Sequence, residues 1–288
     1  MAPTDYSVVQ RETGPDLAMY WKPADDAVAV LVFVHGFAEH AGRYAHVFAA
    51  FPRCHCLGFD LRGHGNSGGP RGHIRRFDEY RQDLAWVLEE ARSRGPGLPL
   101  FLVGHSFGGL VATEAVLSLQ TSLAGLILSS PGFALQFVPP VWERGMARLM
   151  TWICPGLTRP ARVPVDRLSH DPAVAERVLQ DPLSLRRASV RWYTECLAAQ
   201  RRVLAAGREL RIPLLCLVAG QDALVVPEAT RVFFETVASL DKRLEFYPEA
   251  YHELFQETEQ QEVFDLMWRW CEARLPGMIP KPVEEKPL

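Results

Sequence analysis

The sequence lacks features that mark several large classes of protein. It has no apolar run near the ~20 residues that cross a bilayer, and its first residues, Met-Ala-Pro-Thr-Asp-Tyr, lack the basic and apolar regions of a signal peptide. Basic side chains are not in excess, with 31 lysines and arginines against 34 acidic residues, whereas a protein that wraps nucleic acid needs a basic face. We therefore expect a soluble, cytoplasmic protein that does not bind nucleic acid.

Cysteine is sparse and scattered. The six cysteines stand mostly in apolar runs, which suits buried thiols in a reducing compartment better than a disulfide framework. The triplet Cys54-His55-Cys56 has no second cysteine or histidine cluster nearby in the sequence to complete a tetrahedral site. The sequence therefore predicts neither a disulfide framework nor a metal site.

Short apolar runs are the main feature that is present, in a chain of 288 residues with 48% apolar side chains. The run from Val28 to Val34 is wholly apolar and rich in β-branched types, as is typical of a strand buried on both faces. Runs of similar character recur at 54–59, 98–103, 123–128 and 212–219, with a weaker one at 243–247.

Helical patterns lie between these strands, most clearly at 77–91, where apolar residues fall at three- and four-residue spacings. Alternating strands and helices imply right-handed crossovers, and so an α/β fold with a doubly wound, mostly parallel sheet. The stretches 6–9 and 17–21, around Gly14-Pro15, predict an antiparallel hairpin at one sheet edge.

The alternation stops after Pro131. Residues 131–207 are proline-rich and helical in pattern, without a convincing strand, and are too many for a loop. We therefore expect a helical cap at 131–207 over a core made of residues 1–130 and 208–275, followed by a loose tail at 276–288.

The most informative motif is Gly104-His105-Ser106-Phe107-Gly108-Gly109, which stands between an apolar strand and a helical stretch. A nucleophile on a sharp strand-to-helix turn needs glycines two positions before and after it, because the backbone is strained and other chain segments approach closely. The helix N-terminus also favours the negative charge that develops in acyl transfer. We interpret Ser106 as a nucleophile; the alternative is a glycine-rich turn with an incidental serine.

A serine hydroxyl needs a base, and the base needs a carboxylate to orient it. Asp222 and His252 each follow a predicted strand, and the chain order Ser106, Asp222, His252 is that of α/β-hydrolases. We predict His252 as the base and Asp222 as its orienting group. If Asp222 were only a turn residue, Asp241 or Glu249 would replace it.

The negative oxygen of the tetrahedral intermediate needs two N–H donors. One is expected from Phe107, and the other from Phe37 in the loop His35-Gly36-Phe37-Ala38 after the first buried strand. We expect His35 to support this loop by hydrogen bonding, and His105 to point its ring away from the reaction.

Four segments together resemble the monoacylglycerol lipase and lysophospholipase group of α/β-hydrolases: residues 35–44, 60–67 and 104–109, and Ala250-Tyr251-His252. The run Gly-x-x-Glu-His-x-x-Arg-Tyr within 36–44 is the most specific of these. The resemblance implies the α/β-hydrolase fold, a cap that borders an acyl-chain tunnel, and no cofactor. It also implies the roles given above for the three side chains and the two amides.

The resemblance further places Glu39 and Arg43 near the polar headgroup of the substrate, although an ion pair at a helix start explains them as well. Phe255 stands where some members carry a second histidine near the alcohol-binding end. In the cap, apolar side chains such as Trp142 and Met146 either contact the acyl chain or pack cap helices together.

We therefore expect a serine hydrolase that cleaves lipophilic carboxylic esters, foremost monoacylglycerols or lysophospholipids. A broad carboxylesterase, a thioesterase or an acyltransferase would form the same acyl-enzyme, and a lipid carrier with an inert triad is the alternative outside enzymes. The arginine-rich stretch 186–211 has two interpretations, a solvated helix face or a surface through which the cap meets anionic membranes.

Overall fold

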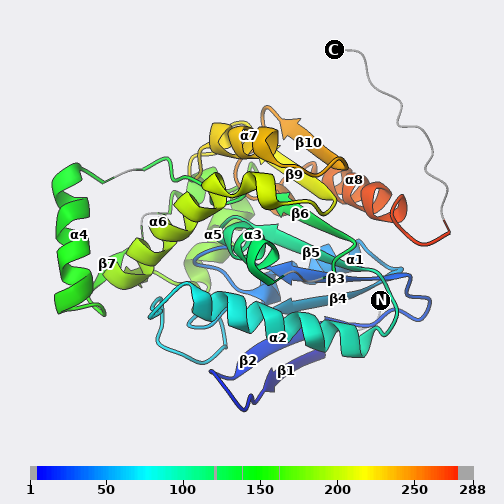
Figure 1. The fold of residues 1–288 in the computed structure, drawn as a ribbon, viewed down its shortest axis with the longest axis horizontal. Coiled ribbons are helices and arrows are strands. Elements are labelled where there is room, and N and C mark those ends of the chain that lie inside the picture. The colour runs from blue at the N-terminus through cyan, green and yellow to red at the C-terminus, as the bar shows by residue number, and fades with distance from the viewer. Residues whose placement is uncertain (1–4, 120–121, 138, 162, 278–288) are drawn as a thin grey trace.

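The centre of the computed structural model is an eight-stranded sheet, and the model describes residues 5–119, 122–137, 139–161 and 163–277 (Figure 1). The strand order is β1-β2-β4-β3-β5-β6-β9-β10. Pairing from β4 to β10 is parallel, whereas β1 and β2 pair antiparallel with each other, and β2 pairs antiparallel with β4. This confirms the predicted mostly parallel sheet and its edge hairpin. The strands are β1 (Asp5–Val9), β2 (Leu17–Lys22), β3 (Ala29–Val34), β4 (Cys54–Phe59), β5 (Leu100–His105), β6 (Gly125–Ser129), β9 (Leu214–Ala219) and β10 (Lys242–Tyr247).

The central strands are buried along their whole length. Every residue of β3, β5, β6 and β9 is buried, which explains why their sequences are continuous apolar runs and do not alternate. Their parallel pairing brings the carboxyl ends of all these strands to one edge of the sheet. The loops that leave this edge hold the motifs found in the sequence.

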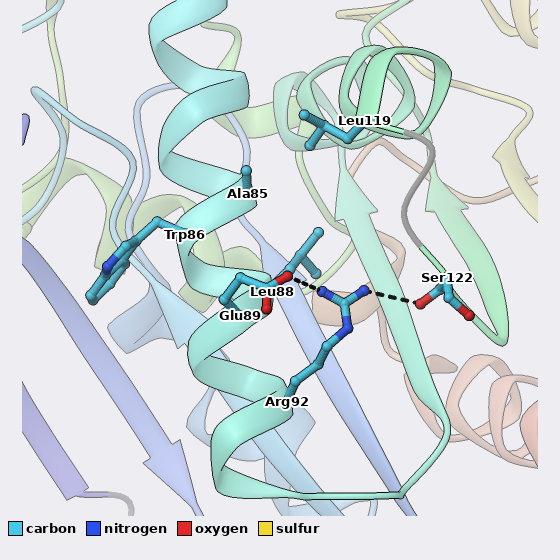
Figure 2. A pocket seen from close by; sticks show the side chains of 7 residues that line it. All are labelled: Ala85, Trp86, Leu88, Glu89, Arg92, Leu119 and Ser122. Carbon is cyan, nitrogen blue, oxygen red and sulfur yellow. Dashed lines mark hydrogen bonds and ion pairs between the residues drawn. The ribbon is translucent and has the colours of Figure 1, made fainter.

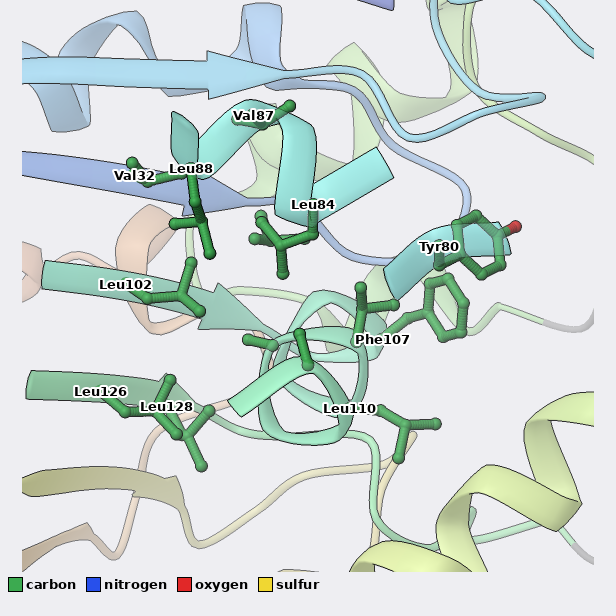
Figure 3. Close-up of a cluster of buried hydrophobic side chains, with 14 of the residues drawn as sticks. Val32, Tyr80, Leu84, Val87, Leu88, Leu102, Phe107, Leu110, Leu126 and Leu128 are labelled. Atoms are coloured by element: carbon green, nitrogen blue, oxygen red, sulfur yellow. The ribbon is translucent and has the colours of Figure 1, made fainter. Parts of the chain in front are cut away.

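Helices cover both faces of the sheet and create two apolar cores. On one face, α2, α3 and α7 pack against the strands and α6 packs on α3; Figure 3 shows Leu84 and Leu88 of α2 beside Val32 and Leu102 of the sheet. On the other face, α1 and α8 form the second core. The helices are α1 (Ala45–Ala49), α2 (Asp78–Arg94), α3 (Phe107–Leu119), α4 (Val141–Ile153), α5 (Pro172–Gln180), α6 (Val190–Ala205), α7 (Pro227–Thr236) and α8 (Gln260–Glu272).

The segment 131–207 contains α4, α5 and α6, together with two strands that the sequence pattern did not predict. These are β7 (Thr158–Pro160) and β8 (Arg187–Ser189), which pair antiparallel. Strands of three residues are too short for an apolar run or an alternation to identify them. In Figure 1, α4 projects away from the sheet at one side of the molecule, where it packs along α6.

The predicted tail at 276–288 lies almost wholly outside the described residues. Within the described ranges, no helix is long and apolar enough to cross a membrane.

Candidate active site

The motif Gly104 to Gly109 forms a tight turn between β5 and α3. Ser106 has a φ of 51°, in the left-handed region that is strained for a residue with a side chain. Its N–H donates to the Ser129 carbonyl at 2.9 Å, and its own carbonyl accepts from the amides of Gly109 and Gly132 at 2.9 and 2.8 Å. These three backbone bonds hold the strained conformation in place.

Glycines flank the serine because other backbone comes too close for a side chain. A Cβ on Gly108 would collide with the carbonyl of Val34 in β3, and one on Gly104 would lie 2.7 Å from the carbonyl oxygen of Gly108 and the Cα of Gly109. This is the physical reason for the glycine spacing seen in the sequence.

The structure brings the three predicted side chains together at the carboxyl edge of the sheet. His252 Nε2 lies 2.8 Å from Ser106 Oγ, and His252 Nδ1 lies 2.6 Å from Asp222 Oδ2. The other oxygen of Asp222 accepts from the amides of Leu224 and Val225 at 2.8 and 2.9 Å, which fixes the carboxylate with one oxygen toward the imidazole. All three side chains belong to buried residues.

The alternative orienting groups lie elsewhere. Asp241 pairs with Arg274, which follows the C-terminal end of α8, and Glu249 accepts a hydrogen bond from Gln221. Asp222 is therefore the carboxylate that the fold places beside His252.

Four buried histidines surround the elbow, and their charge states differ. Burial lowers the pKa of His35, His64 and His105 to about 3, so these rings are neutral. Burial also disfavours the protonated form of His252, but the charge and hydrogen bond of Asp222, together with the charges of Glu253 and Glu39, outweigh it and raise the pKa above the ordinary 6.5. Among these four, His252 is the one poised to take up a proton.

His35 and His105 occupy the positions expected of them. His35 Nδ1 donates to the Gly36 carbonyl at 2.7 Å and Nε2 accepts from the Leu61 amide at 2.9 Å, so the ring braces the loop after β3. The His105 ring packs 5.0 Å from the His252 ring, and its Nδ1 lies 3.3 Å from Ser129 Oγ, not near the serine hydroxyl.

The amides of Phe37 and Phe107 are free to bind an oxyanion. Neither donates a hydrogen bond to an acceptor within the described ranges. The loop of Phe37 lies against the nucleophile, because a Cβ on Gly36 would be 3.2 Å from Ser106 Cβ. The rings of both phenylalanines pack against Trp192 of α6, at 4.4 and 5.1 Å between centroids, so α6 covers this side of the site.

Glu39 and Arg43 lie beside the site but are paired with protein groups. Arg43 contacts Glu39 and also Glu253, the residue after His252, with N–O distances of 2.7 to 3.0 Å. Glu39 is buried and also accepts from the Gly36 amide at 2.5 Å. The ion pair considered from the sequence is present, and it extends to a third residue that the sequence pattern did not indicate.

The other three candidates for substrate contact lie in two different environments. Phe255 is buried in the core between His105 and Phe264. Trp142 and Met146 lie on α4 with 69% and 47% of their surface exposed.

A second carboxylate after the base, Glu257, joins the His252 loop to the segment 131–207. Its Oε1 accepts from the Tyr251 amide at 2.6 Å and lies 3.0 Å from His170 Nδ1. Its Oε2 accepts from the His170 amide at 2.9 Å and from the Ser169 hydroxyl at 3.2 Å. The sequence pattern did not identify Glu253 or Glu257. The one sequence feature that could have indicated their contacts is that both follow His252 closely in the chain.

Two surface hollows lie away from this site. One, of about 490 Å³, lies between α2 and the end of α3, where Arg92 bonds to Glu89 and to the Ser122 carbonyl (Figure 2). The other, of about 760 Å³, lies between α2, α3 and α6. Neither is lined by a residue of the triad. In the described ranges, no group of three or more histidine, cysteine or acidic side chains is arranged to hold a metal ion.

Three features define the class of this protein as an α/β-hydrolase. They are the order of the strands, Ser106 on its strained turn, and His252 bonded to both Ser106 and Asp222. The sequence profile of a family described as serine aminopeptidase, S33, matches residues 25–259, and the chain belongs to this family. Within it, the chain is an ester hydrolase of the monoacylglycerol lipase-like group.

Sequence relatives support this placement. The chain is 36% identical to phospholipase YtpA of Bacillus subtilis, over 85% of this chain and 95% of that protein. It is 32% identical to a monoacylglycerol lipase of Mycolicibacterium smegmatis, over 88% and 92% of the two chains.

Solved structures agree in fold. A monoacylglycerol lipase from Paleococcus ferrophilus matches 90% of this chain and 99% of its own, with a TM-score of 0.81 and 28% identity. A monoglyceride lipase variant from Saccharomyces cerevisiae matches 96% of both chains with a TM-score of 0.84, and at 20% identity it shows the likeness of fold alone.

The close approach at the elbow gives a direct test. Gly108→Ala places a methyl group against the backbone of β3, so we expect a loss of ~1–3 kcal/mol in the free energy of unfolding and weaker labelling of Ser106 by a fluorophosphonate. Thermal unfolding and probe labelling measure the two effects.

Gly145→Ala in α4 is the matched control. A Cβ at Gly145 meets nothing within 4 Å, so alanine should stabilise the helix by about 0.5–1 kcal/mol. Equal stability of Gly108→Ala and the wild-type protein would contradict the packing described here.

Proposed function

We propose that this protein hydrolyses lipophilic carboxylic esters through an acyl-enzyme on Ser106. His252 takes the proton of the Ser106 hydroxyl, which attacks the ester carbonyl, while Asp222 stabilises the resulting imidazolium. The amides of Phe37 and Phe107 bind the oxyanion, and the protonated His252 gives its proton to the leaving alcohol. Water then releases the acid by the same steps in reverse order. The continuous hydrogen-bonded path from Ser106 through His252 to Asp222 is the observation that carries this proposal.

We propose monoacylglycerols or lysophospholipids as the substrates. The relatives at 36% and 32% identity are named as a phospholipase and a monoacylglycerol lipase, and both align over more than nine-tenths of their own length. A single acyl chain on a polar headgroup is common to the two substrate classes.

We propose that residues 131–207 form a cap over the site. Trp192 of this segment packs on both phenylalanines of the oxyanion loops, and Gln136 donates to the Asp222 carbonyl at 3.1 Å. The segment therefore contacts residues around Ser106 and Asp222, where an acyl chain would enter.

We also propose that α4 lets the cap contact a lipid bilayer. Its outward face is apolar, with Trp142, Trp152 and Ile153 exposed by 69%, 82% and 66%. Arg144 and Arg148 on the same helix supply positive charge suited to anionic lipids. Contiguous apolar side chains exposed to water are typical of a contact surface, and a membrane is also the source of the proposed substrates.

Loss of the nucleophile tests the chemistry. Ser106→Ala should lower kcat about a million-fold, or ~8 kcal/mol in activation free energy, by comparison with other serine triads. The substrate panel should include a monoacylglycerol, a lysophospholipid, a short ester and an acyl-CoA at matched concentration, with fluorophosphonate labelling of the wild-type protein as the control. Retention of more than about a tenth of the activity would exclude Ser106 as the nucleophile. Faster release from the short ester or acyl-CoA would assign a different substrate class.

The charge on Asp222 makes a prediction about pH. His252 must be neutral to accept a proton, so kcat/KM should fall on acidification, with a midpoint above 6.5. Asp222→Asn keeps the shape but removes the charge that raises the His252 pKa, so the midpoint should move to lower pH and kcat should fall about 10⁴-fold. A pH profile of the two proteins measures this, and an unchanged midpoint would show that Asp222 does not set the His252 pKa.

Membrane contact is tested on α4. The double substitution Trp142→Glu and Trp152→Glu should weaken binding to vesicles containing phosphatidylglycerol by at least about tenfold, because two large apolar side chains no longer enter the bilayer. Hydrolysis of a short soluble ester should not change, since both side chains face solvent. Leu240→Glu, at a fully exposed leucine beside β10, is the control. If it weakens binding equally, α4 is not the contact surface.

A further inference from the structure

We propose that Arg43 is a positioning residue that ties the oxyanion loop, residues 35–38, to the loop that carries His252. The sequence left two interpretations of Arg43 open, a contact with the substrate headgroup or an ion pair with Glu39. The inference rests on the proposed serine chemistry and extends it, because it concerns what holds the oxyanion loop and His252 in position relative to Ser106.

The contacts of Arg43 join two loops that are far apart in the sequence. Its Nη1 donates to Glu39 Oε2 at 2.9 Å and to Glu253 Oε1 at 3.0 Å, and its Nη2 donates to Glu253 Oε2 at 2.7 Å. The pairing with Glu253 is bidentate, which fixes the relative orientation of the two planar groups. The guanidinium is also largely buried, with 12% of the side chain exposed.

On one side, Glu39 passes this constraint to the oxyanion loop. Its Oε1 accepts from the Gly36 amide at 2.5 Å and from the Tyr44 hydroxyl at 2.9 Å, while its Oε2 binds Arg43. Gly36 is in close contact with Ser106, so a shift of the Glu39 carboxylate would move the Phe37 amide relative to the nucleophile.

On the other side, Glu253 is covalently next to His252 and is held at two points. Its carboxylate binds Arg43, and its backbone N–H donates to the Leu168 carbonyl at 2.8 Å. His252 therefore lies between Asp222, which holds its ring, and an anchored neighbour, which holds its backbone.

These contacts favour positioning over headgroup binding. Arg43 faces two carboxylates, so its positive charge is more than compensated and the three side chains together carry one excess negative charge. These bonds use three of the five guanidinium N–H groups, and a neutral headgroup such as glycerol that took the place of a carboxylate would replace charge-assisted bonds, which are stronger than bonds between neutral groups. Breaking a buried ion pair to bind a neutral alcohol is unfavourable.

The excess negative charge also acts on the base. Asp222, Glu253 and Glu39 all favour the protonated form of His252, and the remaining ring packed against it, His105, is neutral. Removing the charge of Glu253 should therefore lower the His252 pKa, and the acid limb of kcat/KM should move to lower pH.

The main experiment compares wild-type protein and Arg43→Lys on two esters of the same acyl chain, a monoacylglycerol and a p-nitrophenyl ester without the glycerol headgroup. Lysine keeps the positive charge, but its single nitrogen cannot make the bidentate bond to Glu253 and also reach Glu39. We expect kcat to fall by about 10- to 100-fold with little change in KM, and by the same factor on both esters, because the oxyanion loop and the base lose their alignment.

A second variant and a control separate this role from a general loss of stability. Glu253→Gln keeps the shape of the side chain, and we expect it to lower kcat and to move the acid midpoint of kcat/KM to lower pH. Arg11→Lys changes another buried arginine, which pairs with Asp83 near the sheet edge, and should leave kcat and the midpoint unchanged.

Three results would overturn the inference. A loss of activity confined to the monoacylglycerol would make Arg43 a headgroup ligand, and unchanged kcat on both esters would remove any role. If Arg43→Lys does not fold, Glu253→Gln decides: an unchanged kcat and an unchanged acid midpoint of kcat/KM in that variant would show that the Arg43–Glu253 pair has no positioning role. Lack of both hydrolysis and Ser106 labelling in the wild-type protein would refute the proposed function itself, and so is distinguishable from these results.

Discussion

The hydrogen bond between the imidazole of His252 and the hydroxyl of Ser106 joins residues 146 positions apart, and the rest of the site depends on it. No local structure could bring these groups together. The bond exists because β5, β9 and β10 run parallel and end at the same edge of the sheet, so that their loops meet. The apolar cores on both faces hold the strands in this register, and the site takes its geometry from the sheet.

Charge distribution around this bond separates one histidine from three others. Buried histidines without a carboxylate partner become neutral, whereas His252 has Asp222 on its ring and Glu253 next to it in the chain. The fold thus uses burial and nearby acids together. Burial alone would lower the pKa of His252 so far that its ring could not hold a proton during the reaction. Carboxylates in water, without burial, would shift this pKa very little.

Much of the fold and of the candidate site could be predicted from the sequence, because these parts rest on local patterns. Buried parallel strands are apolar runs in the sequence. The glycine spacing in 104–109 predicts a tight turn, since only glycine fits where Gly108 meets the Val34 carbonyl. The strand ends then place Asp222 and His252. The pair Arg43–Glu253, in contrast, spans 210 positions and has no local pattern, so the sequence offered only a headgroup contact or the ion pair with Glu39 for Arg43. The sequence also did not predict the short strands β7 and β8 or the four hydrogen bonds to Glu257. Each of these depends on contacts between segments that are far apart in the chain.

The helix that begins with Phe107 is enclosed on every side over its first nine residues. Nine consecutive residues, Phe107 to Ala115, are buried, and even the Glu114 carboxylate is compensated by Arg202 of α6. This part of the helix has no solvent-facing stripe, so it has almost no position at which a larger or smaller side chain would be accepted. Engineering of substrate preference in this scaffold therefore has to leave that helix untouched and draw its diversity from the surface-exposed elements between Pro131 and Gly207.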